Sequence, residues 1–549
     1  MNASKKCFLL CIAMALAIVC AAVSPCSAQA PNDLGVLDGF SHSAAYASNA
    51  SGQTVGMSFD NEIDGGRAFL WLPQAAWGLS AGMHELGGSS GYACSKAVDI
   101  NTQGEVIGTC WNGGDTDSRT FLWLPEAAYG MTAGFHLLDG LPGEAKNWVV
   151  DINDAGYIVG NSAINIGGIE EPWFQTRGFL WYNGTVTALT MDDGAPITFD
   201  TNYSCHYVNQ SGQVIGQFDY YPYPDAYFSI RRAVLWDGGA TTILDDGMSF
   251  GEAIGINDNG EVVGRWGEGR EVFLYLPQAA YGLEAGLHQL AAEADRTVVN
   301  QIFTYGINNA GQIVGWNSPG SQYVPDPNGE GSWVSAPGVL WIWQNGSFTD
   351  ISTVDVDDAY FYINSSGQVA GSIIDVLWDD DWNYLGWSVQ GCCWSQADGF
   401  KVLDTLGGTM NEVYGINDGG QPLGCSYLAD DAASHACLWG AIAPPEPESA
   451  LTVSDATVTI RNPKTLSVTV LIGNPSATET AYDVTVTAAG LGGVDTNSSL
   501  PLVFGAVKPG ATKKCTLQFK GVPSGEQTLI IGGTSSLGDF SSTQSTLVP

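Results

Sequence analysis

Two stretches of the chain combine aromatic rings with acidic residues, a composition that suits carbohydrate binding. The segment 378–387 holds four aromatic rings beside three consecutive aspartates, and the segment 218–227 is rich in tyrosine. Flat aromatic faces stack on sugar rings, while neighbouring carboxylates accept hydrogen bonds from sugar hydroxyls. We therefore predict ligand contacts at Trp378, Trp382, Tyr384, Trp387, Tyr220, Tyr221 and Tyr223. The alternative is that these rings pack down over the edges of the strands beside them.

A third segment has the spacing of a calcium loop. Asp326, Asn328 and Glu330 place side-chain oxygens at alternate positions around Pro327 and Gly329. Calcium prefers oxygen ligands, although this segment lacks the bidentate glutamate that completes an EF-hand loop. We predict calcium as the one candidate cofactor, bound by Asp326, Asn328 and Glu330; the alternative is a polar insertion loop that binds no metal.

The sequence contains no motif of an established catalytic mechanism. It has no Gly-x-Ser-x-Gly elbow, no His-Glu-x-x-His pair and no phosphate-binding loop. Paired acids such as Asp192-Asp193 and Asp357-Asp358 occur, but glycosidases need two carboxylates at a defined separation in one cleft, which sequence neighbours do not establish. His84, His136 and His288 recur in copies of one phrase and have a structural role in this interpretation. We predict that the protein is not an enzyme.

The charge of the chain restricts its partners. Its 549 residues carry 19 basic and 57 acidic side chains, which gives a formal net charge of −38. Nucleic acids and anionic membrane surfaces repel such a protein. With 45% hydrophobic residues the chain can nevertheless bury a core, and its length suits two or three domains.

The N-terminal residues 1–30 have the features of an export signal. Lys5 and Lys6 precede the apolar run Cys7–Val23, and Ala28-Gln29-Ala30 has the form of a cleavage site. No later stretch approaches 18 uninterrupted apolar residues, so we predict a secreted or cell-surface protein with no membrane span in the mature chain.

Eight cysteines follow the signal and offer two candidate disulfides. Cys94 and Cys110 flank a predicted hairpin turn, and Cys425 and Cys437 form a second candidate pair. Oxidation outside the cytoplasm would permit both bridges, while unpaired buried thiols are the equally weighted alternative.

The strongest pattern is an internal repeat with a period near 52 residues. The motif Asn-x-x-Gly-x-apolar-x-Gly recurs eight times, with successive spacings of 52, 52, 56, 48, 51, 56 and 53 residues. Asn and Gly favour hairpin turns, and the alternating flanks predict strands. Its Asn residues are Asn49, Asn101, Asn153, Asn209, Asn257, Asn308, Asn364 and Asn417.

Each hairpin is followed by a short apolar strand, such as Ala68–Trp71, and then by a fourth strand, such as His84–Gly88. Four strands per repeat are typical of a propeller blade. The eighth unit lacks its fourth strand. The segment Asp33–Gly39 resembles the fourth strand of a unit whose first three strands are missing. We therefore predict an all-β fold in which an eight-bladed β-propeller is closed by the N-terminal strand. A solenoid, two stacked sheets and a seven-bladed ring are the alternatives.

The repeat resembles the HAF-type extracellular repeats of bacterial secreted proteins. The pattern Asp-Leu-Gly, Ile-Asn-x-x-Gly-x-Val-Val-Gly and His-Ala-Phe-Leu-Trp carries this resemblance, with its best match to the last phrase at His435–Trp439. Most units replace the histidine, for example with Arg67 or Arg119. The resemblance covers about residues 32–440; it implies export and a propeller-like fold, and it implies no particular activity.

The remaining chain forms a separate predicted domain. The Pro-rich segment 441–450 reads as a linker, and about seven short alternating strands over 451–549 predict an immunoglobulin-like β-sandwich. With the propeller at 31–440, this organisation favours a non-catalytic binding or adhesion-type protein whose propeller loops meet an extracellular glycan or protein. The alternatives are a structural component of the envelope or matrix and a propeller-based polysaccharide hydrolase or lyase.

Overall fold

The computed structural model of the chain contains strands, turns and loops. The described residues are 30–61, 65–87, 91–113, 117–165, 174–190, 202–220, 229–244, 250–267, 271–292, 301–318, 320–325, 331–354, 356–378, 384–429, 431–442, 451–462, 465–474, 481–508, 511–535 and 538–549. They divide into two compact units, one ending at Pro444 and the other beginning at Pro445, a division inside the predicted linker. The predicted export signal, apart from Ala30, lies outside the described residues.

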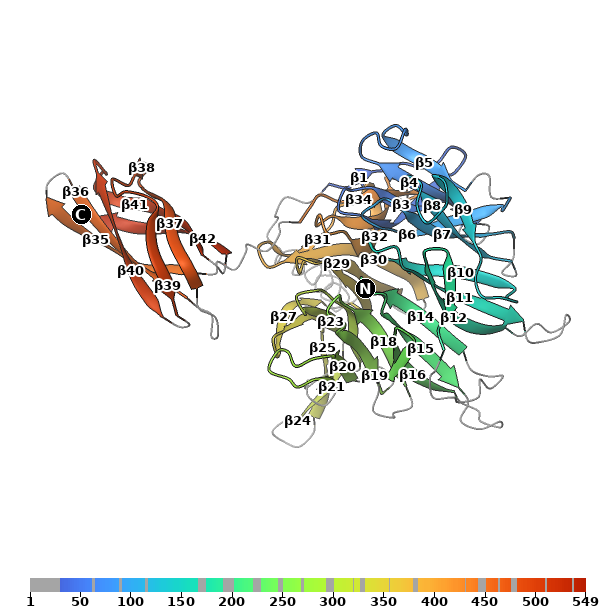
Figure 1. The fold of residues 1–549 in the computed structure, drawn as a ribbon. Helices are drawn as coiled ribbons and strands as arrows, with labels where there is room; N and C mark the ends of the chain where they lie inside the picture. Colours follow the sequence, from blue (N-terminus) through green and yellow to red (C-terminus); the bar gives the residue numbers. More distant parts are fainter. Residues whose placement is uncertain are drawn as a thin grey trace, which may run out of the picture. The chain divides into compact units, whose positions relative to one another are not determined.

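The first unit is an eight-bladed β-propeller, as predicted. Each blade is an antiparallel four-stranded sheet, and Figure 1 shows the blades following one another around a ring in chain order. The first seven blades are β2-β3-β4-β5, β6-β7-β8-β9, β10-β11-β12-β13, β14-β15-β16-β17, β18-β19-β20-β21, β22-β23-β26-β27 and β28-β29-β30-β31, and the eighth is β32-β33-β34-β1. Eight sheets exclude the seven-bladed alternative.

The innermost strands of the blades lie nearest the axis of the ring. They are β2 (His42–Ser48), β6 (Cys94–Ile100), β10 (Lys146–Ile152), β14 (Asn202–Val208), β18 (Gly251–Ile256), β22 (Ile302–Ile307), β28 (Asp358–Ile363) and β32 (Gly407–Ile416). The second strands are β3 (Thr54–Asn61), β7 (Val106–Trp111), β11 (Ile158–Asn165), β15 (Val214–Tyr220), β19 (Val262–Trp266), β23 (Ile313–Asn317), β29 (Val369–Trp378) and β33 (Pro422–Leu428).

The third strands are the apolar segments that the repeat predicts after each hairpin. They are β4 (Gly65–Leu72), β8 (Arg119–Leu124), β12 (Phe174–Tyr182), β16 (Ile230–Asp237), β20 (Glu271–Leu276), β26 (Gly338–Gln344), β30 (Tyr384–Ser395) and β34 (Ser434–Leu438). The outermost strands are β5 (Gly82–Leu86), β9 (Gly134–Leu138), β13 (Thr185–Ala188), β17 (Ala240–Ile243), β21 (Gly286–Ala292), β27 (Ser347–Val354), β31 (Gly399–Val402) and β1 (Asn32–Asp33). An additional hairpin in the sixth blade joins β24 (Gly320–Pro325) to β25 (Gly331–Ala336).

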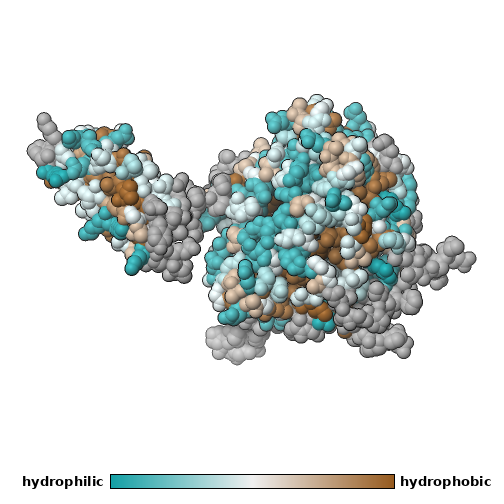
Figure 2. Space-filling model, viewed as in Figure 1, coloured by the Kyte–Doolittle hydropathy of each residue, from teal (hydrophilic) through white to brown (hydrophobic). Residues whose placement is uncertain are grey.

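The hydrophobic core lies between neighbouring blades. One cluster joins Val55 and Leu70 of the first blade to Val106 and Phe121 of the second, and all four side chains are fully buried. Burial of a side chain of this size contributes about 1.5–3 kcal/mol. Because both faces of a blade are covered in this way, the third strands are apolar on both faces. Hydrophilic side chains occupy much of the outer surface seen in Figure 2, in agreement with the strongly negative charge.

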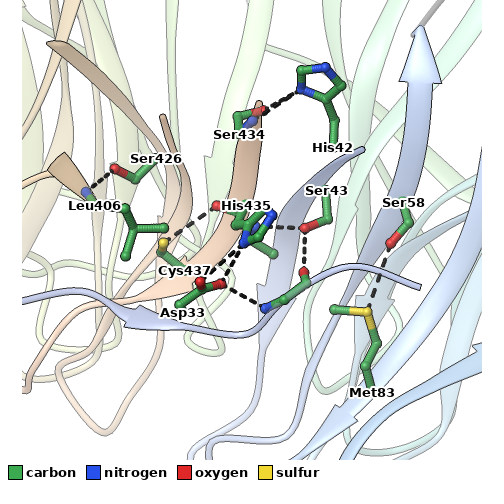
Figure 3. A network of polar contacts seen from close by, with 12 residues as sticks. Asp33, His42, Ser43, Ser58, Met83, Leu406, Ser426, Ser434, His435 and Cys437 are labelled. Carbon is green, nitrogen blue, oxygen red and sulfur yellow. Dashed lines mark hydrogen bonds and ion pairs between the residues drawn. The ribbon is translucent and has the colours of Figure 1, made fainter. Parts of the chain in front are cut away.

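The N-terminal strand closes the ring, as the sequence predicts. Asn32 and Asp33 pair with Leu438 and Cys437 of β34, and His435 Nδ1 lies 2.9 Å from Asp33 Oδ1 (Figure 3). The Ser43 hydroxyl donates a hydrogen bond to the Gly35 carbonyl and accepts one from the Ala436 amide. These contacts join the first and last blades and pair a strand edge that would otherwise be exposed.

The repeated Asn forms a closed ring of hydrogen bonds. In each blade its side-chain amide donates to the backbone carbonyl of the Asn in the next blade, at donor–acceptor distances of 2.5–3.2 Å. Within its own turn the Asn257 Oδ1 accepts the amides of Asn259 and Glu261, which shows how each Asn also holds its hairpin. One residue type therefore stabilises the turn and joins the blades.

The first Gly of the motif is required by both backbone and packing. All eight have φ between 73° and 84°, which favours glycine. Residues from the preceding blade also cover several of these positions: Trp77 lies against Gly104, and Tyr129 against Gly156, so that a Cβ would clash. Trp77 and Tyr129 come from the formulaic loop between the third and fourth strands, which explains why this loop is repeated.

The second unit consists of two antiparallel sheets around one core. One sheet has the order β35-β36-β40, and the other β38-β37-β41-β42 with β39 paired to β37. Their strands are β35 (Thr452–Asn462), β36 (Thr465–Gly473), β37 (Ala481–Leu491), β38 (Val494–Asp495), β39 (Leu502–Val507), β40 (Thr512–Lys520), β41 (Gly525–Ser535) and β42 (Gly538–Val548). Val470, Phe519 and Ile531 are among the core residues contributed by both sheets. The second unit is thus an all-β unit as predicted, and its immunoglobulin-like classification stays a prediction.

The predicted disulfides are wrong. Cys94 lies opposite Trp111, whereas Cys110 lies opposite Ser95, one register position away. Successive positions on a strand point to opposite faces of the sheet, so the two sulfurs cannot meet. The same offset separates Cys425, opposite Ala436, from Cys437, opposite Gly424. All four side chains are buried, and none forms a disulfide.

Candidate functional site

The innermost strands surround a cavity of about 460 Å³ on the axis of the propeller, called the channel below. Every blade contributes to its wall, which therefore depends on the closed ring. The lining residues are Tyr46–Ser48, Val98, Asp99, Val150, Asp151, Tyr207, Ile254–Ile256, Tyr305–Ile307, Tyr362, Ile363, Tyr414–Ile416 and Leu423.

A recurrent β-bulge directs side chains into the channel. In seven of the eight innermost strands the register shifts by one residue shortly before the repeated Asn; β28 lacks the shift. A bulge bends the strand and changes the direction of the side chains around it. As a result, both Val98 and Asp99 of β6 face the channel, as do Val150 and Asp151 of β10.

Two carboxyl groups from adjacent blades meet in this wall. Asp99 Oδ2 accepts a hydrogen bond of 3.3 Å from the Ile152 amide, and Asp151 Oδ2 accepts one of 2.8 Å from the Val208 amide. The two carboxyl groups also interact with each other, and a hydrogen bond between them forms only when one of them carries a proton.

The surroundings of the pair favour that proton. Burial, the charge of Asp151 and a hydrogen bond donated to Asp151 hold the pKa of Asp99 well above its usual range. Burial also raises the pKa of Asp151, although its hydrogen bonds with Val208, Asp99 and Ile152 oppose this shift. The pair therefore stays partly protonated up to a higher pH than two exposed aspartates would.

Five tyrosines complete the polar lining of the channel, and two of them retain available hydroxyl groups. Tyr207 and Tyr362 form no hydrogen bond with the described residues, and Tyr207 is 46% exposed to the interior of the channel. Burial, followed by the charges of Asp151 and Asp99, raises the pKa of Tyr207 to about 12. Burial raises the pKa of Tyr362 to about 12 as well. Both hydroxyls thus stay protonated at neutral pH and can donate hydrogen bonds.

The hydroxyls of two other channel tyrosines have partners inside the protein. Tyr305 donates to the Ala359 carbonyl, and Tyr414 donates to Glu412 Oε2 at 2.8 Å. The Tyr46 and Tyr414 rings lie 5.5 Å apart between centroids. These contacts hold the rings in place, so their faces can form a preorganised wall.

A second cavity of about 410 Å³ adjoins the channel and is mostly aromatic and apolar. It shares Tyr46, Val98 and Val150 with the channel and adds Lys96, Thr109, Trp111, Trp148 and Val149. Lys96 Nζ lies 3.8 Å from the centroid of the Tyr46 ring, in the geometry of a cation–π contact. Aromatic faces here continue directly into the polar channel.

The aromatic segment predicted from the sequence forms an exposed hairpin. Residues 375–378 of β29 and 384–388 of β30 pair only with each other, beyond the four-stranded part of the blade. Tyr384 is 58% exposed and Trp387 is 50% exposed, so these rings do not pack down over the blade edge. Trp378 is the last residue of β29, and Trp382 lies outside the described residues.

The other predicted site residues fall mainly in segments that the structure does not describe. Tyr220 ends β15, whereas Tyr221 and Tyr223 lie outside the described residues. The calcium candidates Asp326, Asn328 and Glu330 also lie outside them, and the calcium site stays a prediction. Within the described ranges, no three or more His, Cys, Asp or Glu side chains converge as a metal site. The same part of the chain contains no helix long and apolar enough to cross a membrane.

The repeated histidines have the same local contact in three blades. The imidazole Nε2 lies 2.7–2.8 Å from the backbone carbonyl four residues earlier, which is Ser80 for His84, Thr132 for His136 and Glu284 for His288. Each imidazole therefore stabilises the loop that contains it.

The Asp99–Asp151 pair was not found by the sequence analysis, although the sequence contains a signal for it. In two consecutive repeats the motif reads Val98-Asp99-Ile100-Asn101 and Val150-Asp151-Ile152-Asn153, with an acid two residues before the repeated Asn. Equivalent positions of adjacent blades approach one another at the axis of a propeller. A search for acids at equivalent repeat positions, instead of acids adjacent in sequence, would have identified the pair.

No protein-family model and no curated protein matches the chain. Among solved structures, similarity extends to the β-propeller domain of the Trilobed protease from Pyrococcus furiosus, with 8% identity over 66% of this chain and 98% of that chain, at a TM-score of 0.37. A luciferin-regenerating enzyme matches with 9% identity over 55% of this chain and 88% of that chain, at a TM-score of 0.29. The polysaccharide lyase Uly1 matches with 10% identity over 76% and 88% of the respective chains, at a TM-score of 0.24.

Proposed function

We propose that this protein is a non-catalytic binding protein that holds a glycan at the axis of its propeller. The observation that carries the proposal is the continuity of two cavities, one lined by Tyr46, Trp111 and Trp148 and the other by the Asp99–Asp151 pair. Aromatic faces bind the apolar faces of sugar rings, and carboxyl and phenol groups bind sugar hydroxyls. The arrangement offers both kinds of contact within one continuous site.

The geometry of the carboxyl pair favours binding over hydrolysis. Glycosidases separate their two carboxyl groups by about 5–9.5 Å, so that a sugar or a water molecule fits between them. Asp99 and Asp151 instead interact directly, so that each carboxyl group shifts the pKa of the other. Such a pair can donate one hydrogen bond and accept several, which suits recognition of a polyhydroxylated ligand.

The exposed hairpin would provide a second contact for a longer glycan. Tyr384, Leu385 and Trp387 present apolar surface to solvent at the end of β29 and β30. Location outside the cytoplasm, at the cell surface or in the medium, rests on the signal-like residues 1–30. The HAF-type resemblance and the immunoglobulin-like second unit agree with that location and belong to the same proposal.

A glycan-array screen of the purified protein, with calcium and then with a chelator, tests the proposal. Two single variants locate the site: Trp148→Ala removes a ring beside the channel, and Trp387→Ala removes one from the hairpin. We expect Trp148→Ala to weaken binding to the selected glycans by about tenfold or more, because loss of one stacked ring costs about 1–3 kcal/mol. Loss of binding with the chelator would assign a role to the calcium candidates.

Three results would contradict this proposal in different ways. Retention of full affinity by Trp148→Ala together with its loss in Trp387→Ala would move the glycan site to the hairpin. Chemical turnover of a bound glycan would show catalysis. An array without binding in either condition would favour a protein partner or a structural role.

A further inference from the structure

We propose that the sugar bound in the channel carries a protonated amine, so that the ligand is an amino sugar with a free ammonium group held between Asp99, Asp151 and the tyrosine rings. This inference rests on the proposed function and adds the charge of the ligand to it. The composition of the channel wall differs from that of an ordinary neutral sugar site and favours a positively charged ligand.

The channel wall combines acids with aromatic rings and contains no base. Its described lining includes two aspartates and five tyrosines, and no lysine, arginine or histidine. The faces of aromatic rings attract cations electrostatically, and carboxylates reinforce this attraction. A neutral hydroxyl gains only hydrogen bonds from such a wall, whereas an ammonium group gains hydrogen bonds and electrostatic attraction to the carboxylates and ring faces.

The protein itself already contains an ammonium group in this setting. Lys96 Nζ lies 3.8 Å from the centroid of the Tyr46 ring, on the side of the adjoining cavity. Tyr46 also lines the channel, close to Tyr414. The contact shows that the ring positions here accept an ammonium at cation–π distance.

The same wall is unsuited to a divalent metal ion. Calcium takes six to eight oxygen ligands, and magnesium requires octahedral coordination. Asp99 and Asp151 supply two carboxyl groups, and the described residues contain no third acidic, His or Cys side chain that converges on them. The rest of the polar lining consists mainly of tyrosines and not of further carboxylates, which favours an organic cation.

Proton release provides a signature of such a ligand. Burial and the charge of Asp151 raise the pKa of Asp99 well above its usual range, so the free pair stays protonated to a higher pH than an exposed carboxyl group would. A bound ammonium group favours both carboxylates in their charged form, so it lowers that pKa and releases the proton to solvent. Affinity should therefore fall as the pH is lowered from 7 to 5, because protons compete with the ligand.

The other titratable groups that line the channel are tyrosines. Those that face the carboxyl pair are Tyr46 on β2, Tyr207 on β14, Tyr305 on β22, Tyr362 on β28 and Tyr414 on β32; β18 contributes none. Lys96, His206 and Glu412 belong to the same innermost strands and lie outside the channel lining. The phenols of Tyr207 and Tyr362, with pKa values raised to about 12, do not titrate between pH 5 and 7.

The experiment is isothermal titration calorimetry of the purified protein with two matched probes, the tetramers of glucosamine and of N-acetylglucosamine. They differ in charge and in the acetyl group. We expect the glucosamine tetramer to bind about tenfold more tightly or better, with proton release detected as a heat that depends on the buffer. The double variant Asp99→Asn/Asp151→Asn should lose this preference and the proton release.

A control variant separates the local effect from net charge. Glu126→Gln/Glu284→Gln removes two exposed acids from the formulaic loops and should keep the full preference. Equal affinities of the wild-type protein for the two tetramers would overturn the inference and leave the proposed function intact; this comparison needs no variant to fold. If neither tetramer binds, the glycan proposal fails, and 1,4-diaminobutane then tests the charge inference alone: binding lost in the channel variant supports cation recognition, and absence of binding overturns it.

Discussion

The side-chain amide of Asn417 donates a hydrogen bond of 3.1 Å to the backbone carbonyl of Asn49, which lies 368 residues earlier in the chain. This contact completes a ring in which every blade holds the next through the same residue type. The ring lies at the end of the innermost strands, directly after the residues that line the channel. The stability of the propeller and the shape of its channel therefore depend on one set of turns.

Removal of one member of this ring should destabilise the propeller strongly. Asn257→Ala removes bonds to Asn308, Asn259 and Glu261 from a side chain that is 2% exposed. Buried groups left without partners cost about 1–3 kcal/mol each, so we expect a loss of roughly 2–4 kcal/mol in the free energy of unfolding. Chemical denaturation measures it. Asn259→Ala, in the same turn but exposed, is the control and should cost less than about 1 kcal/mol.

Two glycines with similar backbone angles allow packing to be separated from strain. Gly104 (φ 84°) lies against Trp77, whereas Gly130 (φ 77°) has open space around it. We expect Gly130→Ala to cost about 1 kcal/mol from backbone strain alone, and Gly104→Ala to cost about 1–3 kcal/mol more from the clash with the ring. A double variant with Trp77→Ala should recover part of the difference. Equal losses for the two single variants would show that Trp77 does not constrain Gly104.

Neutralising Asp99 should stabilise the protein at neutral pH. Because the pKa of Asp99 is raised on folding, the folded state holds a proton that the unfolded state has released, and stability falls as the pH rises above the pKa of the unfolded chain. Asp99→Asn removes this penalty. We expect its melting temperature to exceed that of the wild type by about 1–3 °C at pH 7, with the difference disappearing near pH 4. A lower melting temperature at pH 7 would contradict the assignment.

The N-terminal segment should be required for a closed and stable ring. Deletion of residues 31–40 removes β1 and the buried Leu34, and it exposes the edge of β34. We expect a lower melting temperature and concentration-dependent association, because an unpaired edge strand pairs with other chains. Calorimetry and light scattering measure the two effects. The substitution Asp33→Asn keeps the strand and tests the contact with His435 separately.

Thiol titration tests the correction to the disulfide prediction. In denaturant and without reductant, we expect a chain from residue 31 onward to show eight reactive thiols; four would indicate that both predicted bridges form. In the folded state reaction should be slow, since burial raises the pKa of thiols such as Cys205 to about 12.

The repeat made most of the propeller predictable. Asn and Gly at a period near 52 residues specify turns through local hydrogen bonding and positive φ, and these requirements do not depend on distant contacts. The number of blades and the closure by the N-terminal strand followed from counting units. The cysteine pairs failed because proximity in sequence ignores the face of a strand, which pairing register decides at single-residue resolution.

By itself the sequence determined the turns, the strand pattern and the acidic charge, whereas the exposure of Trp387 came from the structure. Only the tertiary structure decided that Asp99 and Asp151 lie in one channel wall, because they are 52 residues apart and meet only when two blades pack around a common axis. Local propensity acts over a few residues, whereas a channel is made by the closure of the whole ring. The candidate site could therefore be located only in the closed ring, and not from local sequence patterns.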